Sequence, residues 1–324
     1  AHDLYECIEW AAAQPWSSGK VGLLGISYYG INQWAAAALQ PPHLAAICPF
    51  EGCNDSYRDM ARHGGILCDF VPLWQPVQVS IVQYGLGSRG KVSRINGMRV
   101  SGDIDLPDEE LAANSVNVKE EFLQHELNDE YYMNRTTDLS KVTVPVLSCG
   151  NWGGNALHLR GNVEGFLRAG SKEKFLEIHG LEHFTEFYTD YGREMQKAFF
   201  DHYLKGKDTW HQAPVHLRLR NVDGTFQDVD EQEWPIARTQ WTRYYPNTSD
   251  MSLSDKPGDG GNISFAAMGD WLTFMTEPLK EDMVIAGPLS AKLYVKSTTE
   301  DADIFITVRV FDPDGKDVTF VSAN

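Results

Sequence analysis

The sequence predicts an α/β fold that is interrupted by a helical segment and followed by an all-β module. Helical and strand patterns alternate in residues 1–54 and again in residues 141–207, which is typical of α/β proteins. Residues 55–140 between these stretches lack the alternation and are predicted to be an insertion or cap. From residue 208 to 324 the chain becomes rich in short β patterns bounded by turn signals.

The first segment has the order helix, strand, helix, strand. Apolar residues recur at helical spacing over His2–Gln14, and Pro15 ends that pattern. The short apolar runs Val21–Leu24 and Leu44–Pro49 have the length of buried parallel strands. Asn32–Leu39, between them, is predicted to be helical.

The inserted segment and the second α/β segment are predicted from the same kinds of pattern. In the insertion, helical spacing covers Tyr57–Arg62, Asp108–Ala113 and Val118–Tyr132. The alternation then returns with predicted strands and helices in turn: Val142–Cys149, Asn155–Ala169, Phe175–Ile178 and Thr185–Leu204.

The C-terminal module is predicted to be a β-sandwich or jelly roll. Its strand patterns are Val215–Leu219, Thr239–Tyr245, Leu272–Met275, Ser290–Lys296 and Ile304–Phe311. The acidic stretch Asp312–Asp317 could suggest a calcium loop, but its Asp314-Gly315 pair is better explained by a β-hairpin turn.

Composition excludes several classes of function. The 28 basic and 45 acidic residues give a net charge of −17, which repels phosphate backbones and argues against nucleic-acid binding. No apolar run approaches the ~18 residues that a membrane span needs. The five cysteines are an odd number without CxxC spacing, so we expect buried thiols rather than a disulfide framework or a zinc site.

The motif that points to chemistry is Gly25-Ile26-Ser27-Tyr28-Tyr29-Gly30. A predicted strand precedes it and a predicted helix follows, as in a nucleophile elbow. Such a turn strains the backbone of the serine and leaves no room for side chains at the flanking glycines. The alternative is a plain strand-to-helix turn in which Ser27 only caps the helix.

Together with the following Asn32–Ala36, this motif resembles the Gly-x-Ser-Tyr-x-Gly elbow of the CocE/NonD hydrolases. Other matching stretches are Asp3, Trp10, Gly19–Gly22, Val144–Leu147, Gly150 and Gly180–His183. The resemblance implies a partial α/β-hydrolase core in two segments (1–54 and 141–207), an inserted helical cap (55–140) and a C-terminal jelly roll (208–324). This jelly roll would be of the galactose-binding-like kind and incomplete. It also implies that the first strands of the core precede Ala1 in a longer protein.

The resemblance assigns roles to individual residues. Ser27 would be the nucleophile, His183 the general base, and the backbone N–H of Tyr28 one donor of the oxyanion hole. A second donor is expected upstream of Ala1. His179 lies at a strand end and competes with His183, but it matches no histidine of the family; a metal site formed by the two is a further, weaker alternative.

The triad acid departs from the family pattern. The family places an aspartate after the strand that corresponds to Val142–Cys149, and Gly153 occupies that position here. Because parallel strands end at the same edge of a sheet, the acid can follow the preceding strand instead. Glu51 is therefore predicted to orient His183, within about 2.6–3.2 Å of a ring nitrogen. Asp55 is the alternative.

The sequence thus predicts a serine hydrolase that cleaves ester or amide and peptide bonds through an acyl-enzyme, either an esterase or dipeptidyl-peptidase-like. The expected partner is a small ester or peptide substrate, without nucleic acid, membrane, cofactor or metal; a homo-oligomer is an open possibility. A catalytically weak homologue whose β module binds carbohydrate or protein is the alternative, and a metal-dependent hydrolase ranks third.

Overall fold

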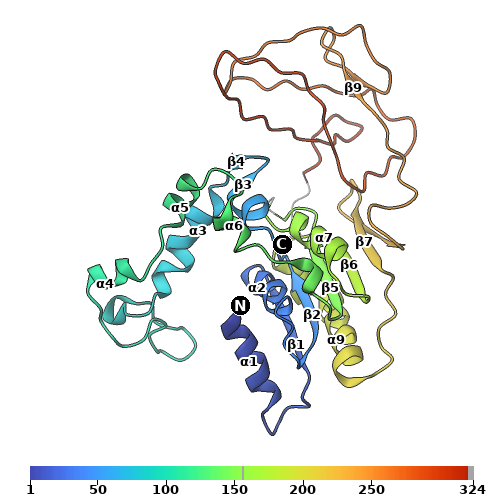
Figure 1. The fold of residues 1–324 in the computed structure, drawn as a ribbon. Coiled ribbons are helices and arrows are strands. Elements are labelled where there is room, and N and C mark those ends of the chain that lie inside the picture. Colours follow the sequence, from blue (N-terminus) through green and yellow to red (C-terminus); the bar gives the residue numbers. More distant parts are fainter. Residues whose placement is uncertain (155–156, 320–324) are drawn as a thin grey trace. The chain divides into compact units, whose positions relative to one another are not determined.

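The computed structural model describes residues 1–154 and 157–319. The chain separates into two compact units, with the boundary between Arg218 and Leu219. Figure 1 follows the chain from its N-terminal helix in blue to the C-terminal segment in red.

The first unit contains a parallel sheet, which confirms the predicted α/β class. Its strand order is β1-β2-β5-β6-β7, and each neighbouring pair is parallel. The strands are β1 (Val21–Ile26), β2 (Leu44–Phe50), β5 (Val146–Asn151), β6 (Lys174–His179) and β7 (Val215–Arg220). β5 begins later than predicted because a turn at Leu139–Lys141 and then Pro145, which lacks an N–H, precede it.

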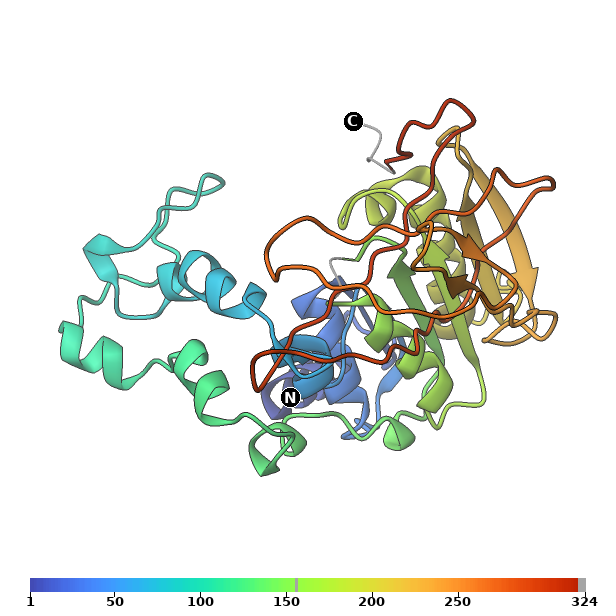
Figure 2. The same ribbon diagram turned by 90° about the horizontal axis from the view of Figure 1, so that it is seen from above.

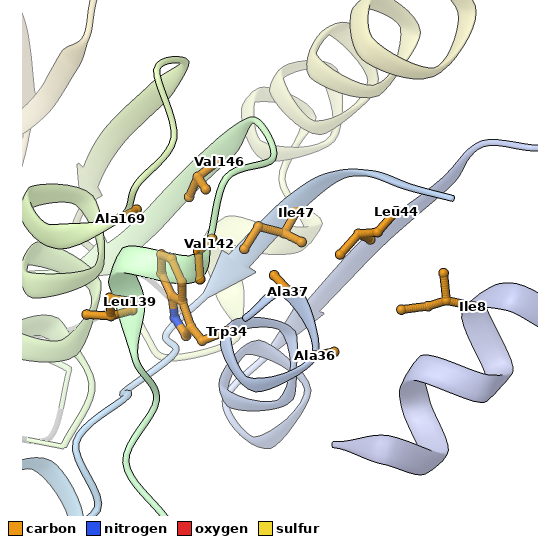
Figure 3. Packing of buried hydrophobic residues seen from close by; sticks show 10 residues of the cluster. All are labelled: Ile8, Trp34, Ala36, Ala37, Leu44, Ile47, Leu139, Val142, Val146 and Ala169. Atoms are coloured by element: carbon orange, nitrogen blue, oxygen red, sulfur yellow. The ribbon is translucent and has the colours of Figure 1, made fainter. Parts of the chain in front are cut away.

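Helices cover both faces of this sheet. The helices α1 (His2–Ala12), α2 (Tyr28–Ala37) and α7 (Leu159–Arg168) pack on one face, where Trp34 is fully buried (Figure 3). α9 (Asp190–Lys205) packs on the other face. Successive side chains of a strand point to opposite faces of the sheet, so the strands contribute to two separate apolar clusters, one under each set of helices. The sheet is thereby buried on both sides, and polar residues lie at the carboxyl ends of its strands.

The insertion between β2 and β5 is helical, as predicted, and lies to one side of the sheet in Figure 2. It contains a π-helix (Ser56–Ala61), a short hairpin of β3 (Arg62–His63) and β4 (Ile66–Leu67), α3 (Phe70–Gln78), 3₁₀ turns at Ser80–Val82 and Gly87–Arg89, α4 (Asp108–Ala113), α5 (Val118–Gln124) and α6 (Glu130–Met133). Sequence patterns missed α3, whose Pro72 and Pro76 lower the helical signal.

Two helices predicted as continuous are each divided by a capping residue. Val118–Tyr132 becomes α5 and α6, because the Asp129 side chain caps α6 by accepting from the N–H of Tyr131. Thr185–Leu204 becomes α8 (Thr185–Tyr188) and α9, because Thr189 caps α9.

The second unit has little regular structure among its described residues. It begins with a hairpin in which the N–H of Asn221 donates to the carbonyl of Thr225, leading from β7 into β8 (Phe226–Glu231). β9 (Tyr245–Pro246) and β10 (Leu253–Ser254) form a small ladder. The predicted strands Ser290–Lys296 and Ile304–Phe311 are not strands in the described chain, since they find no ladder partner beyond an isolated bridge at Phe311. The jelly roll stays a prediction.

Three smaller predictions have clear outcomes. Asp312–Asp317 is a hairpin turn, as predicted, because the N–H of Asp312 donates to Lys316 and Gly315 has φ +78°. The cysteines are free thiols, and Cys48, Cys53 and Cys149 are buried as predicted. Cys7 is exposed and Cys68 is only half-buried, so the prediction of burial is wrong for these two. Among the described residues, no helix is long and apolar enough to cross a membrane.

Candidate active site

The polar groups of interest gather at the carboxyl edge of the parallel sheet. Ser27 follows β1, Glu51 follows β2, and Asn151 and His179 are the last residues of β5 and β6. Adjacent strands pair Ile26 with Phe50 and Asn151 with His179, so these positions lie at the same level along the sheet. This edge is where open α/β sheets bind ligands.

Ser27 lies in a strained turn at the start of α2. Its φ of +59° is in the left-handed region, which a residue with a side chain rarely adopts. A Cβ at Gly25 would lie 2.5 Å from Tyr29 Cβ, and one at Gly30 would lie 2.5 Å from the Phe50 carbonyl oxygen. The glycines are therefore required by close approach, and the Ser27 side chain makes no capping hydrogen bond.

Tyr28 is the first residue of α2. Because the first N–H groups of a helix have no intrahelical acceptor, its backbone N–H can bind a developing oxyanion next to Ser27. The N-terminal end of the helix also favours negative charge there.

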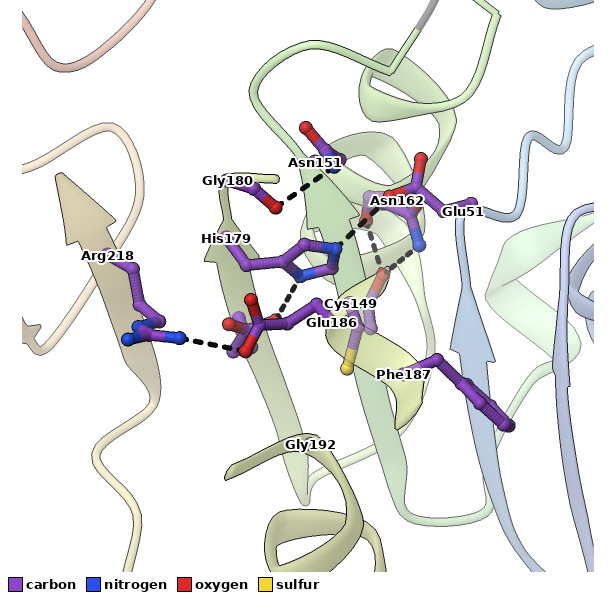
Figure 4. A network of polar contacts seen from close by, with 12 residues as sticks. Glu51, Cys149, Asn151, Asn162, His179, Gly180, Glu186, Phe187, Gly192 and Arg218 are labelled. Carbon is purple, nitrogen blue, oxygen red and sulfur yellow. Dashed lines mark hydrogen bonds and ion pairs between the residues drawn. The ribbon is translucent and has the colours of Figure 1, made fainter. Parts of the chain in front are cut away.

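Glu51 is fully buried and also has a left-handed backbone, with φ +48°. Its Oε2 lies 3.6 Å from His183 Nδ1, and its Oε1 lies 3.2 Å from His179 Nε2 (Figure 4 shows the His179 side). Burial by itself would raise the pKa of Glu51, but the imidazoles of His179 and His183 outweigh it, and the pKa is lowered. Glu51 is thus an ionised carboxylate between two histidines.

The Glu51–His183 distance is longer than the predicted hydrogen bond. Within the described part of the chain, neither carboxylate oxygen of Glu51 has a partner in hydrogen-bond geometry, so both are close polar contacts rather than hydrogen bonds. The carboxylate is shared, since its other oxygen faces His179. This sharing is the physical reason that the predicted distance is not reached.

His158 was missed by sequence reasoning. It lies just before α7, is 2% exposed, and its Nε2 is 3.5 Å from Ser27 Oγ. Its ring stacks on that of His183, with centroids 4.9 Å apart. The sequence analysis placed it inside the predicted helix Asn155–Ala169, whereas the helix begins at Leu159 and His158 precedes it. A histidine close after a predicted strand end, at the edge that carries Ser27, was the available signal.

Burial lowers the pKa of His158 to about 4, with Glu51 opposing and His183 adding to the decrease. His158 is therefore neutral at neutral pH. Its helix is anchored to the cap, because Arg160 pairs with the buried Asp59 at 2.7 Å and a Cβ at Gly161 would lie 2.4 Å from Cys53 Cα. The imidazole at Ser27 is thus held in place by packing.

The glycine loop after β5 makes room for Glu51. A Cβ at Gly154 would lie 3.1 Å from Glu51 Oε2. Asn151 organises this loop: its Oδ1 accepts from the N–H of Gly153, and its Nδ2 donates to the carbonyls of Gly180 and Leu181 (Figure 4). The loop that leads to His183 is thereby tied to the end of β5.

Asp55, the alternative acid, has another task. Its side chain accepts from the N–H groups of Tyr57 and Arg58 and pairs with the Arg58 guanidinium, which caps the π-helix. The structure does not bring Asp55 to His183. No group of three or more potential metal ligands is found in residues 1–154 and 157–319.

Comparison with known proteins adds to this geometry. Residues 1–185 match the family model of X-Pro dipeptidyl-peptidase (S15 family). Residues 209–323 match the X-Pro dipeptidyl-peptidase C-terminal non-catalytic domain.

Individual relatives are more distant. The chain is 24% identical to cocaine esterase from Rhodococcus sp. (strain MB1 Bresler), over 97% of this chain and 66% of that protein. It is similar to a CocE/NonD family hydrolase of known structure from Staphylococcus aureus, with 31% identity and a TM-score of 0.64, over 78% of this chain and 42% of that one. An α-amino acid ester hydrolase, 18% identical with a TM-score of 0.57, shares the fold over 80% of this chain and 47% of its own.

The chain thus spans 66% of the length of the cocaine esterase and less than half of these two solved structures. The family match covers Ser27, Glu51 and His183 together. The chain belongs to the X-Pro dipeptidyl-peptidase (S15) family, among the CocE/NonD serine hydrolases.

Proposed function

We propose that the protein containing this chain is a serine hydrolase that cleaves ester or amide and peptide bonds through an acyl-enzyme. Ser27 is the nucleophile, His183 the general base and Glu51 the acid that orients it. The observation that carries the proposal is the strained backbone of Ser27 at the start of α2, at the same sheet edge as a buried carboxylate paired with a histidine.

The chemistry follows from these positions. Ser27 Oγ attacks the substrate carbonyl carbon while its proton passes to His183, and the N–H of Tyr28 binds the oxyanion. His183 then gives the proton to the leaving group, and the C–O or C–N bond breaks. Water attacks the acyl-enzyme with His183 again as base, which releases the carboxylic acid and restores Ser27.

Two histidines lie near Ser27, and their electrostatic environments separate their roles. His183 Nδ1 faces the Glu51 carboxylate, which holds the proton on that nitrogen and stabilises the imidazolium formed during attack. His158 has a lowered pKa. The Nδ1 atoms of both histidines lack a hydrogen-bond partner in the described chain, but that of His183 lies 3.6 Å from a carboxylate oxygen. His158 is therefore a weak base, and we assign it to a contact with Ser27 and the substrate.

The test is covalent labelling of the full-length protein with a fluorophosphonate, together with hydrolysis of p-nitrophenyl acetate. Ser27→Ala is expected to abolish both. His183→Ala should reduce turnover by a factor on the order of 10⁴ or more, as loss of the base does in triad enzymes. His158→Ala should cost far less; the reverse order of the two histidines would contradict the assignment.

The substrate class is proposed from the relatives. The family model is that of an X-Pro dipeptidyl-peptidase, and one relative is a cocaine esterase. Comparison of kcat/KM on p-nitrophenyl acetate and on Gly-Pro-p-nitroanilide distinguishes an esterase from a dipeptidyl-peptidase. The sequence patterns began the jelly roll at residue 208, but residues 208–218 lie in the first unit, where β7 pairs with β6. The part of the chain from residue 219 onward is proposed to be a jelly roll that contributes no triad residue, which the match of residues 209–323 to a non-catalytic domain supports.

A catalytically weak homologue is the second candidate. Two distances favour it: Ser27 Oγ is contacted by His158 at 3.5 Å, and Glu51 lies 3.6 Å from His183, beyond a normal hydrogen bond. In that case the C-terminal unit would bind carbohydrate or a protein partner. Labelling by fluorophosphonate separates the candidates, because it requires an activated serine.

A further inference from the structure

His179 is a buried histidine that the proposed mechanism does not use. It is the last residue of β6 and is 1% exposed. Its Nδ1 lies 2.8 Å from Glu177 Oε2, and its Nε2 lies 3.2 Å from Glu51 Oε1 (Figure 4). Both carboxylates are fully buried.

This geometry determines the charge of the ring. A neutral imidazole has one nitrogen without a proton. In this site that nitrogen would lie beside a carboxylate oxygen, and the lone pairs of the two atoms would repel each other. Two ionised carboxylates at opposite ring nitrogens therefore require two N–H groups, that is, an imidazolium. One cation between two anions leaves the three groups with a net charge of −1, so a single charge remains for interaction with His183.

The electrostatic environment of His179 also favours the protonated ring. Burial would lower the pKa of His179, but the negative charges of Glu177 and Glu51 and the hydrogen bond to Glu177 raise it to about 10. The Glu177 end is itself held, because the Tyr191 hydroxyl donates to Glu177 Oε1 at 3.3 Å. His179 is thus anchored on the side that faces away from Glu51.

We propose, on the basis of the function assigned above, that His179 is a positioning residue whose imidazolium holds Glu51 Oε1 and directs Oε2 toward His183. The acid in this chain follows β2 rather than β5, and its carboxylate is buried without a hydrogen-bonded partner in the described residues. A fixed cation on one oxygen keeps such a buried carboxylate ionised and limits its rotation. Glu51 therefore needs His179 to act on His183.

Other charged or titratable groups lie near Glu51, His179 and Glu177 and could contribute to the pH profile. They are His158 before α7, His183 in the loop after β6, Cys149 on β5, Tyr191 on α9, and the Arg218–Glu186 pair of β7 and α8. None of them replaces the cation at Glu51 Oε1, since Arg218 is paired with Glu186 at 2.8 Å and lies over the Tyr191 ring.

The experiment is the pH profile of kcat/KM for p-nitrophenyl acetate in the full-length protein, corrected for active sites by fluorophosphonate titration. In His179→Gln, Glu51 either takes up a proton or leaves an unbalanced negative charge that favours protonated His183. Both effects move the acid limb to higher pH. We expect a shift of at least about one pH unit, which is tenfold in rate below the midpoint.

Glu177→Gln is the matched control, since it keeps His179 and the side-chain volume but removes one negative charge. It should leave the acid limb in place or move it to lower pH, opposite to His179→Gln. Thermal melts report whether each variant folds. If His179→Gln does not fold, His179→Asn and Glu177→Gln carry the test.

The outcomes separate the two proposals. A loss in His179→Gln or His179→Asn that is equal at every pH, with an unchanged acid limb, would overturn the role of His179 and leave the hydrolase proposal intact. An upward shift in Glu177→Gln would also overturn it. Absence of Ser27-dependent labelling in the wild-type protein would contradict the proposed function itself.

Discussion

The carboxyl ends of β2 and β5 are neighbours on one edge of the sheet, but a charged residue follows β2 and glycines follow β5. After β2, Glu51 brings a buried carboxylate into the site with a left-handed backbone. After β5, where the family pattern has an aspartate, the chain has Gly153 and Gly154, and Gly154 lies against Glu51 Oε2. With Glu51 as the proposed triad acid, the comparison teaches that glycines at one strand end leave room for a carboxylate that comes from the neighbouring end.

The largest expected effect tests whether Ser27, which lies at the same sheet edge as the ends of β2 and β5, is the nucleophile. Ser27→Ala should reduce kcat by a factor on the order of 10⁶ and abolish fluorophosphonate labelling, because no other oxygen takes the place of the nucleophile. The thermal melt should be nearly unchanged, since the Ser27 side chain makes no capping hydrogen bond. Labelling that persists in the variant would remove Ser27 from the mechanism.

The next effect tests the end of β2. Glu51→Gln keeps the shape of the side chain but removes the charge that fixes the His183 tautomer, so turnover should fall by a factor of about 10⁴. Asp55→Asn is the matched control: Asp55 caps the π-helix, and its loss should lower stability more than turnover. Equal losses of turnover in the two variants would contradict the choice of Glu51.

A smaller effect tests the end of β5. In Gly154→Ala the new Cβ would lie 3.1 Å from Glu51 Oε2 and 3.1 Å from the Asn151 carbonyl oxygen, so the carboxylate must move by a few tenths of an ångström. We expect a roughly tenfold loss of kcat/KM, below the ~10²-fold cost of a 1 Å misplacement. Gly258→Ala, in the second unit, should leave kcat/KM unchanged; equal effects would show that Gly154 does not make room for the acid.

The smallest effect concerns the second unit. Replacement of any single acidic residue in residues 219–319 should leave the chemical step intact, because the proposed triad belongs to the first unit. Single-turnover acylation by p-nitrophenyl acetate is the measurement. A roughly thousandfold decrease, comparable to loss of a triad residue, would show that this unit supplies a catalytic group.

Local patterns were sufficient for much of the first unit. The alternation of apolar runs predicted β1, β2 and β6 within a few residues, and the elbow glycines identified Ser27. Patterns failed where capping competes with periodicity, as at Asp129 and Thr189, and where prolines lie inside a helix, as in α3. They also placed strands in the second unit that the described chain does not form.

By itself the sequence determined the α/β class and the strained turn at Ser27, because these depend on local spacing. The resemblance to a family then indicated His183 and left Glu51 and Asp55 as possible acids, but it did not indicate His158. Only the tertiary structure decided which of them meet. The parallel register brings residues 27, 51 and 179 to one edge, and the packing of α7 on the cap adds His158. Whether Glu51 faces one imidazole or two depends on distances of a few ångströms between loops far apart in the chain. No local pattern encodes such distances, since they result from the packing of the whole sheet.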